Sequence, residues 1–251
     1  MEAQIHYWTA SDGVKLAYRE IGMGRPVVLV HGLFSDANTN WIKFGHAEKL
    51  AAAGLKVVMP DLRAHGLSDK PQTAEAYPRG VLARDLHELI AHLGFSDYDL
   101  GGFSLGSRTT VQAVGEGERP GRVVLSGMGL EGLSDWNRRQ AFFHEALAQF
   151  DIAQRGDPWW MAIQFMKTMK VDRIAAGHLL RTFEDAHPEW LDAFAMPTLV
   201  LSGTEDQDNG SAPKLVEALP NATYAPVPGT HMSSVTKPEF GEQLVQFLGR
   251  T

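Results

Sequence analysis

Residues 102–106 read Gly-Phe-Ser-Leu-Gly, a G-x-S-x-G pattern that lies where an apolar run ends and a helical pattern begins. At such a strand-to-helix turn the serine backbone is strained, and only small residues fit two places before and after it. The turn lifts the Ser104 hydroxyl above the sheet edge and points the next amides toward its target. Because the bare pattern arises by chance in roughly one chain of this size in ten, the surrounding sequence decides its meaning.

Short apolar runs with little alternation flank this turn on both sides. They lie at 27–30, 57–59, 98–101, 123–125 and 198–201, with a candidate sixth at 224–227. Such runs are typical of strands covered on both faces, as in a parallel sheet. Between them lie helical patterns at 41–53, 80–93, 105–115, 211–219 and 237–249. This alternation predicts an α/β protein with right-handed crossovers and a mostly parallel, doubly wound sheet.

The first twenty residues predict an antiparallel hairpin. Residues 5–9 and 14–18 are rich in β-branched and aromatic side chains, and Ser11-Asp12-Gly13 supplies the turn between them.

The stretch 128–194 breaks the rhythm, because it contains helical patterns and no convincing strand. These patterns lie at 135–150, 158–168, 171–183 and 188–193, among most of the tryptophans. One interpretation is a helical excursion whose aromatic side chains bury its own underside. The other is a lid that lines a pocket over the sheet edge, and both can hold. We therefore expect a core of 1–127 and 195–251 and a helical lid of 128–194.

Composition excludes several classes of function. The chain is 44% hydrophobic and 21% charged, with a net charge of −7 and no basic cluster, which argues against nucleic acid and anionic membranes as partners. The absence of cysteine excludes disulfides, thiolate zinc sites and a cysteine nucleophile. No metal-ligand spacing, phosphate loop or dinucleotide fingerprint is present, so we expect neither metal nor cofactor. Without a signal peptide pattern or a membrane-length apolar run, a cytoplasmic location is expected.

Acyl transfer by a serine needs a base, a group that orients the base, and donors for the developing oxyanion. In a doubly wound sheet these groups must lie at the carboxyl ends of strands. After the run at 27–30 comes His31-Gly32-Leu33-Phe34, in which His31 and Gly32 are interpreted as structural. We expect the backbone amides of Leu33 and Leu105 to form the oxyanion hole.

The loop after 198–201 offers three acids as the orienting group. Asp206 is the predicted acid, Asp208 is the reserve, and Glu205 is expected to be solvated. Glu131 or Asp135, after the preceding strand, remains an alternative position for the acid.

A Pro-Gly turn follows the last apolar run and leads to Thr230, His231 and Met232. His231 is the predicted base because it lies at a strand end late in the chain. The resulting order of serine, acid and histidine is the one that this architecture requires.

Together these segments resemble the α/β-hydrolase superfamily, in its serine-hydrolase, carboxylesterase-like branch, over essentially the whole chain. The matching stretches are His31-Gly32, 61–68, 102–106, 203–206 and Gly229-Thr230-His231. The resemblance implies an α/β-hydrolase fold with an N-terminal antiparallel hairpin and a helical lid insertion. The segment 61–68 is similar to the family's D-x-R-G-H-G-x-S signature, with Ala64 in place of the usual glycine. That signature is structural in the family, so His65 is assigned no catalytic role. Ser107 stands where a second glycine often follows the turn.

Within this family the nucleophile distinguishes the reactions. A serine at 104 argues against haloalkane dehalogenases and epoxide hydrolases, which use aspartate there. Phe103 counts against carbon–carbon bond hydrolases, which typically carry asparagine before the serine. We therefore expect cleavage of an ester, a lactone or a thioester. Carbon–carbon bond hydrolysis and cofactor-free perhydrolysis with the same triad remain alternatives. A third alternative is a ligand-binding or signalling protein with little turnover.

An aromatic and methionine-rich lid predicts a small to medium apolar substrate. The predicted substrate-binding residues are Phe34, Phe103, Trp136, Trp159 and Met232. Two basic residues, Arg108 and Arg138, are assigned surface or packing roles, and the oligomeric state is left open.

Overall fold

The predicted hairpin is present as β1 (Gln4–Thr9) and β2 (Lys15–Ile21), which pair antiparallel. The structure is a computed structural model that describes residues 2–249. The side chains of Asn137 and Arg138 lie outside the described residues, and so does the role predicted for Arg138.

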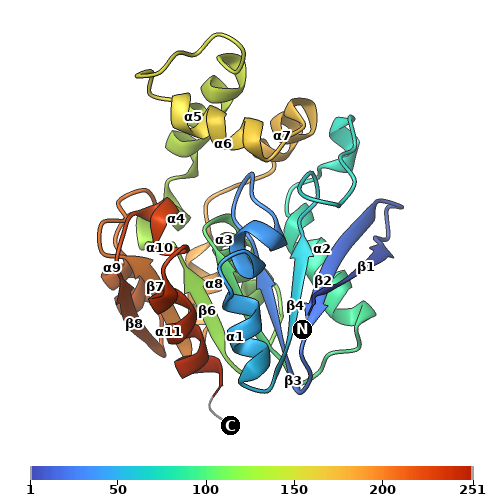
Figure 1. Ribbon diagram of the computed structural model, residues 1–251, viewed down its shortest axis with the longest axis vertical. Helices are drawn as coiled ribbons and strands as arrows, with labels where there is room; N and C mark the ends of the chain where they lie inside the picture. Colours follow the sequence, from blue (N-terminus) through green and yellow to red (C-terminus); the bar gives the residue numbers. More distant parts are fainter. Residues whose placement is uncertain (1, 250–251) are drawn as a thin grey trace.

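One eight-stranded sheet forms the centre of the described chain, in the order β1-β2-β4-β3-β5-β6-β7-β8 (Figure 1). Strand β2 pairs antiparallel with β4, and all pairs from β4 to β8 are parallel. The further strands are β3 (Arg25–Val30), β4 (Leu55–Asp61), β5 (Asp99–Phe103), β6 (Val123–Ser126), β7 (Thr198–Gly203) and β8 (Ala222–Val227). The predicted α/β class and the mostly parallel sheet are thereby confirmed.

Helices cover both faces of the sheet, which explains the unbroken apolar runs. On one face lie α1 (His46–Ala52) and α11 (Pro238–Leu248). On the other lie α2 (Val81–His92), α3 (Leu105–Gly115), α8 (Pro188–Asp192) and α9 (Ala212–Ala218). Successive strand residues point to opposite faces, so both faces must be apolar.

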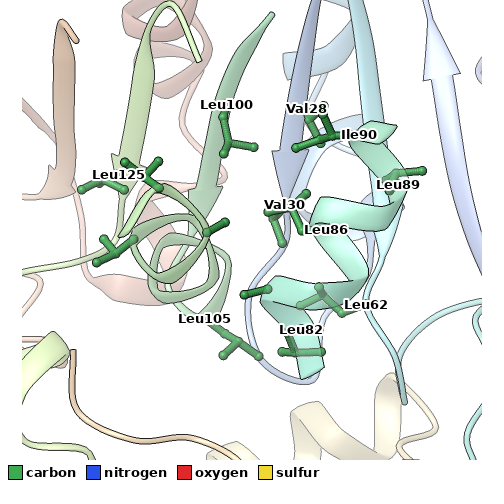
Figure 2. Packing of buried hydrophobic residues seen from close by; sticks show 14 of the residues in the cluster. Val28, Val30, Leu62, Leu82, Leu86, Leu89, Ile90, Leu100, Leu105 and Leu125 are labelled. Atoms are coloured by element: carbon green, nitrogen blue, oxygen red, sulfur yellow. The ribbon is translucent and has the colours of Figure 1, made fainter. Parts of the chain in front are cut away.

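Strand β3 shows this two-sided burial directly. Val27 and Leu29 belong to the cluster under α1 and α11, whereas Val28 and Val30 belong to the cluster under α2 and α3. All four side chains are fully buried. Figure 2 shows Leu86 and Ile90 of α2 beside Val28 and Val30. Packing on both faces of the sheet therefore fixes the end of β3, where the next loop begins.

The single helix predicted over 41–53 is wrong in detail. The chain forms a π-helical turn, η1 (Asn38–Ile42), and α1 begins only at His46. Gly45 separates the two with a φ of 76°. Trp41 of η1 packs against Phe240 of α11, and this contact fixes the turn on the sheet.

A helical segment joins β6 to β7. It comprises α4 (Leu130–Ser134), which the sequence did not predict, then α5 (Trp136–Ala148), α6 (Trp160–Thr168) and α7 (Arg173–Leu180), followed by α8. Helices α5, α6 and α7 lie together beyond one end of the sheet (Figure 1). Short α8 packs instead on α3, where a Cβ on Gly115 would lie 2.3 Å from the Trp190 ring. The boundaries 128 and 194 of a separate lid stay a prediction.

Among residues 2–249, no helix has both the length and the apolar character needed to cross a membrane. A short 3-10 turn, η2 (Ala74–Ala76), precedes α2.

Candidate active site

The turn between β5 and α3 holds Ser104 in a strained backbone conformation, with φ 54° and ψ −110°. A Cβ on Gly102 would lie 2.2 Å from the carbonyl carbon of Gly106, and one on Gly106 would lie 2.0 Å from the carbonyl oxygen of Val30. Real Cβ atoms do not approach backbone this closely. Glycine is therefore required at both positions if α3 is to start directly behind β5.

Three strand ends bring Ser104, His231 and Asp206 together. The Ser104 hydroxyl lies 3.1 Å from His231 Nε2, and His231 Nδ1 lies 2.8 Å from Asp206 Oδ2. All three side chains are largely buried. Because the carboxylate only accepts hydrogen bonds, Nδ1 carries the proton and Nε2 is left to accept the serine proton. Ser104, His231 and Asp206 thus form one hydrogen-bonded chain.

Helix α10 (His231–Ser234) fixes the start of the imidazole-bearing segment. Thr230 is its N-cap, and the Thr230 and Ser233 side chains each accept a hydrogen bond from the other residue's backbone N–H. This reciprocal cap holds His231 at the first helical position.

Within residues 2–249, none of the other acids considered bonds to His231. The backbone N–H of Asp208 donates to Asp206 Oδ1 (3.0 Å), and the Asp208 side chain is exposed, as is that of Glu205. Glu131 accepts from Lys214 Nζ and from the Ser211 N–H, both at 2.8 Å, and so joins α4 to α9. Asp135 is exposed directly before α5.

Two backbone amides beside Ser104 are available as donors. Leu105 is the first residue of α3, so its N–H has no partner within the helix. Leu33 N–H has no hydrogen bond within residues 2–249, although both neighbouring amides do. The Gly32 N–H donates to Asn40 Oδ1 (3.0 Å) and the Phe34 N–H to His65 Nε2 (2.9 Å). Leu33 is therefore the donor that its loop leaves free.

Two buried histidines hold this loop. His31 Nδ1 donates to the Gly32 carbonyl (2.8 Å), and His31 Nε2 accepts from the Leu62 N–H (2.9 Å). His65 Nδ1 donates to the Arg63 carbonyl (2.9 Å) while His65 Nε2 accepts from Phe34. Both rings therefore bond to backbone, and neither touches Ser104 by a hydrogen bond.

The segment 61–68 supports the same loop. The Asp61 carboxylate accepts from the Ala37 and Leu67 N–H groups, both at 2.8 Å, and pairs with Arg19. Ala64, which replaces the family's glycine, has a φ of 68°, in the left-handed region that favours glycine. Ala64 therefore adopts a conformation that is strained for a residue with a Cβ.

Acid should destabilise the fold through His65. Burial, together with the smaller effect of the nearby His31, lowers the pKa of His65 to about 3. An unfolded histidine titrates near about 6.5. Between these values the unfolded chain binds a proton that the native state does not, so the free energy of unfolding falls as pH falls through this window. Urea titrations from pH 7.5 to 4 should show a pH slope smaller by about one proton in His65→Asn than in wild type. Equal slopes would contradict this account of His65.

A cavity of about 860 Å³ opens beside Ser104. Four of the predicted substrate-binding residues, Phe34, Phe103, Trp136 and Met232, line it. Trp159 does not line the cavity; it packs against the apolar cluster of α5, α6 and α7, to which Phe34 and Trp136 also belong. Further apolar lining that the sequence analysis missed comprises Phe44, Met128, Phe142, Phe143, Met161 and Phe165.

Asn209 and Arg108 also line this cavity. The Asn209 Nδ2 group donates to the Gly127 carbonyl (2.7 Å) and lies 3.5 Å from Ser104 Oγ. Its place in the strand-end loop that contains Asp206 is a signal that could have identified it. Arg108 was assigned a surface or packing role, although it stands one helical turn after Ser104.

Among the described residues, Asp206, Asp208 and His231 hold ligand atoms close enough for a metal ion, within 4.8 Å of one another. A cation there would compete with the 2.8 Å hydrogen bond between Asp206 and His231. The donor set therefore suits an oriented imidazole better than a metal.

Comparisons with known proteins agree with the observed fold. A family model described as alpha/beta hydrolase fold matches residues 25–161. A non-heme chloroperoxidase of Kitasatospora aureofaciens is 26% identical, with 96% of this chain and 98% of that protein aligned. Among solved structures, an esterase from Exiguobacterium antarcticum has a TM-score of 0.80 at 19% identity, covering 97% of this chain and 99% of that chain. An enol-lactonase from Burkholderia xenovorans has a TM-score of 0.74 at 22% identity, covering 98% and 100%.

Proposed function

Because the chain belongs to the alpha/beta hydrolase family, we propose that it is a serine hydrolase of carboxylic esters, lactones or thioesters. The observation that carries the proposal is the hydrogen-bonded chain of Ser104, His231 and Asp206 beside two free amides. The names of the similar structures, an esterase and an enol-lactonase, support an ester bond as the target.

In the first half-reaction the Ser104 oxygen attacks the carbonyl carbon while His231 Nε2 takes the hydroxyl proton. The Leu33 and Leu105 amides stabilise the negative charge on the former carbonyl oxygen. The tetrahedral intermediate collapses with cleavage of the bond to the leaving group, which receives the proton from His231. Asp206 stabilises the imidazolium that forms in between.

In the second half-reaction a water molecule attacks the acyl-serine and gives its proton to His231. Collapse of this second intermediate releases the carboxylic acid and returns the proton to the Ser104 oxygen. The apolar walls of the cavity, including Phe103 and Trp136, exclude other water from the reacting carbonyl.

Asp206→Asn should lower kcat for a short neutral ester, such as p-nitrophenyl valerate, by about 10²- to 10⁴-fold. The amide can present an N–H to His231 Nδ1, which favours the wrong tautomer and removes the charge that stabilises the imidazolium. The matched control is Glu205→Gln, in the same loop and exposed, which should stay within about threefold of wild type. Equal losses in the two variants, or full activity of Asp206→Asn, would contradict the assignment of the acid.

A further inference from the structure

The charged side chains around the cavity have the opposite sign to the protein as a whole. Among the described lining residues, Lys43, Arg108 and Arg139 are cations and Asp208 is the carboxylate. The whole chain carries a net charge of −7. A cleft whose charge differs from its surroundings concentrates ligands of the opposite sign. The charges of these side chains therefore favour the binding of an anion in the cavity.

Arg108 is the cation nearest in sequence to the nucleophile. It lies in the first turn of α3, four residues after Ser104, and both residues line the same cavity. Its two Nη groups donate to the carbonyls of Gly132 and Glu184, and its guanidinium lies 5.3 Å from the centre of the Trp136 ring. These partners orient the guanidinium but do not use all five of its N–H donors.

None of these partners neutralises the charge. Within the part of the chain that the structure describes, no carboxylate lies within ion-pair distance of Arg108. Burial lowers the pKa of Arg108 to about 10, with the more distant Asp185 opposing this and Arg139 adding to it. The Asp185 carboxylate itself accepts from the Trp136 N–H (2.7 Å). A partly buried guanidinium without a counter-ion gains most from a carboxylate brought by a ligand.

We propose that the natural substrate carries a carboxylate as well as the bond to be cleaved, and that Arg108 binds this carboxylate in the part of the cavity walled by Met128 and Trp136. The inference rests on the proposed hydrolase function and names its substrate class. Because Ser104 and Arg108 line the same cavity and are only four residues apart, a short diacid fits between them, such as a monoester or lactone related to succinate or glutarate.

The test compares mono-p-nitrophenyl glutarate with p-nitrophenyl valerate, which has a methyl group in place of the carboxylate. Wild type should prefer the glutarate ester by about tenfold or more in kcat/KM. In Arg108→Gln, which keeps a side-chain N–H donor for one carbonyl, the ratio of kcat/KM for the glutarate ester to kcat/KM for the valerate ester should fall by about 10- to 100-fold.

Arg79→Gln is the matched control. It removes the same charge from an exposed side chain, which pairs with the Glu184 carboxylate at 2.9 Å. The backbone carbonyl of Glu184 also accepts a hydrogen bond from Arg108. The preference should be unchanged in this variant. An equal loss in both variants would show a long-range charge effect and overturn the role of Arg108. A wild-type enzyme that cleaves the valerate ester as well as the glutarate ester would overturn the carboxylate site.

Binding separates this inference from the hydrolase proposal and does not depend on turnover. Calorimetry should show glutarate binding to Ser104→Ala, at least tenfold weaker when Arg108→Lys is added, because a lysine cannot bind a carboxylate bidentately. Glutarate binding without ester cleavage by wild type would contradict the proposed hydrolase function and support the carboxylate site. Ester cleavage without glutarate binding to Ser104→Ala would do the reverse.

Discussion

Ser104→Ala is expected to lower kcat/KM for p-nitrophenyl valerate by about four to six orders of magnitude. The methyl group cannot attack the carbonyl, so only the oxyanion donors and substrate binding are left to act. His231→Ala should have nearly the same effect, because Ser104 is unactivated without the base 3.1 Å away. Steady-state kinetics with each pure variant would measure both losses, with circular dichroism as the control for folding.

The double variant Ser104→Ala/His231→Ala should lose little more than either single variant. The two groups act as a unit, so once one is removed the other no longer contributes to catalysis. Independent, multiplying losses would mean that Ser104 and His231 serve separate steps, and would contradict the proton transfer between them.

Gly106→Ala is the substitution with the largest expected effect on the fold near the site. Its Cβ would lie 2.0 Å from the oxygen and 2.6 Å from the carbon of the Val30 carbonyl, so α3 must move away from β3. We expect the free energy of unfolding to fall by about 3 kcal/mol or more. Because the substitution displaces Ser104, kcat should also fall by about 100-fold. Urea unfolding and ester kinetics measure the two effects.

Gly177→Ala is the control for this substitution. Gly177 lies inside α7, and an added Cβ there meets nothing within 4 Å. Because alanine is the better helix former, this variant should gain about 0.5–1 kcal/mol. Wild-type stability and activity of Gly106→Ala would show that the close approach of α3 to β3 is not needed.

Most of the sheet could be predicted because each strand carries its own signal. Val27 to Val30 are all apolar because helices cover both faces of the sheet. A continuous apolar run of this kind indicates a central strand. The turn at Ser104 could be predicted because its glycines are required by contacts within a few residues and with β3. A backbone donor such as Leu33 could be predicted without knowledge of its side chain.

The helical segment between β6 and β7 was less predictable, because its contacts are set by tertiary packing. Nothing in the sequence distinguishes Trp159, which packs inside the segment, from Trp136, which lines the cavity. The rotation of each helix about its axis decides this, and the core beneath fixes that rotation. The partners of Arg108 could not be predicted for the same reason, because the carbonyls of Gly132 and Glu184 lie 24 and 76 residues away.

The proposed reaction requires Ser104 to be an activated nucleophile, and a fluorophosphonate labels serines of this kind. Intact-mass spectrometry of wild type should show one adduct per chain, peptide mapping should locate it on Ser104, and Ser104→Ala should remain unlabelled. A wild-type protein that never labels and never cleaves short esters would contradict the account and identify a ligand-binding protein on this fold. Labelling that persists in Ser104→Ala would place the nucleophile elsewhere.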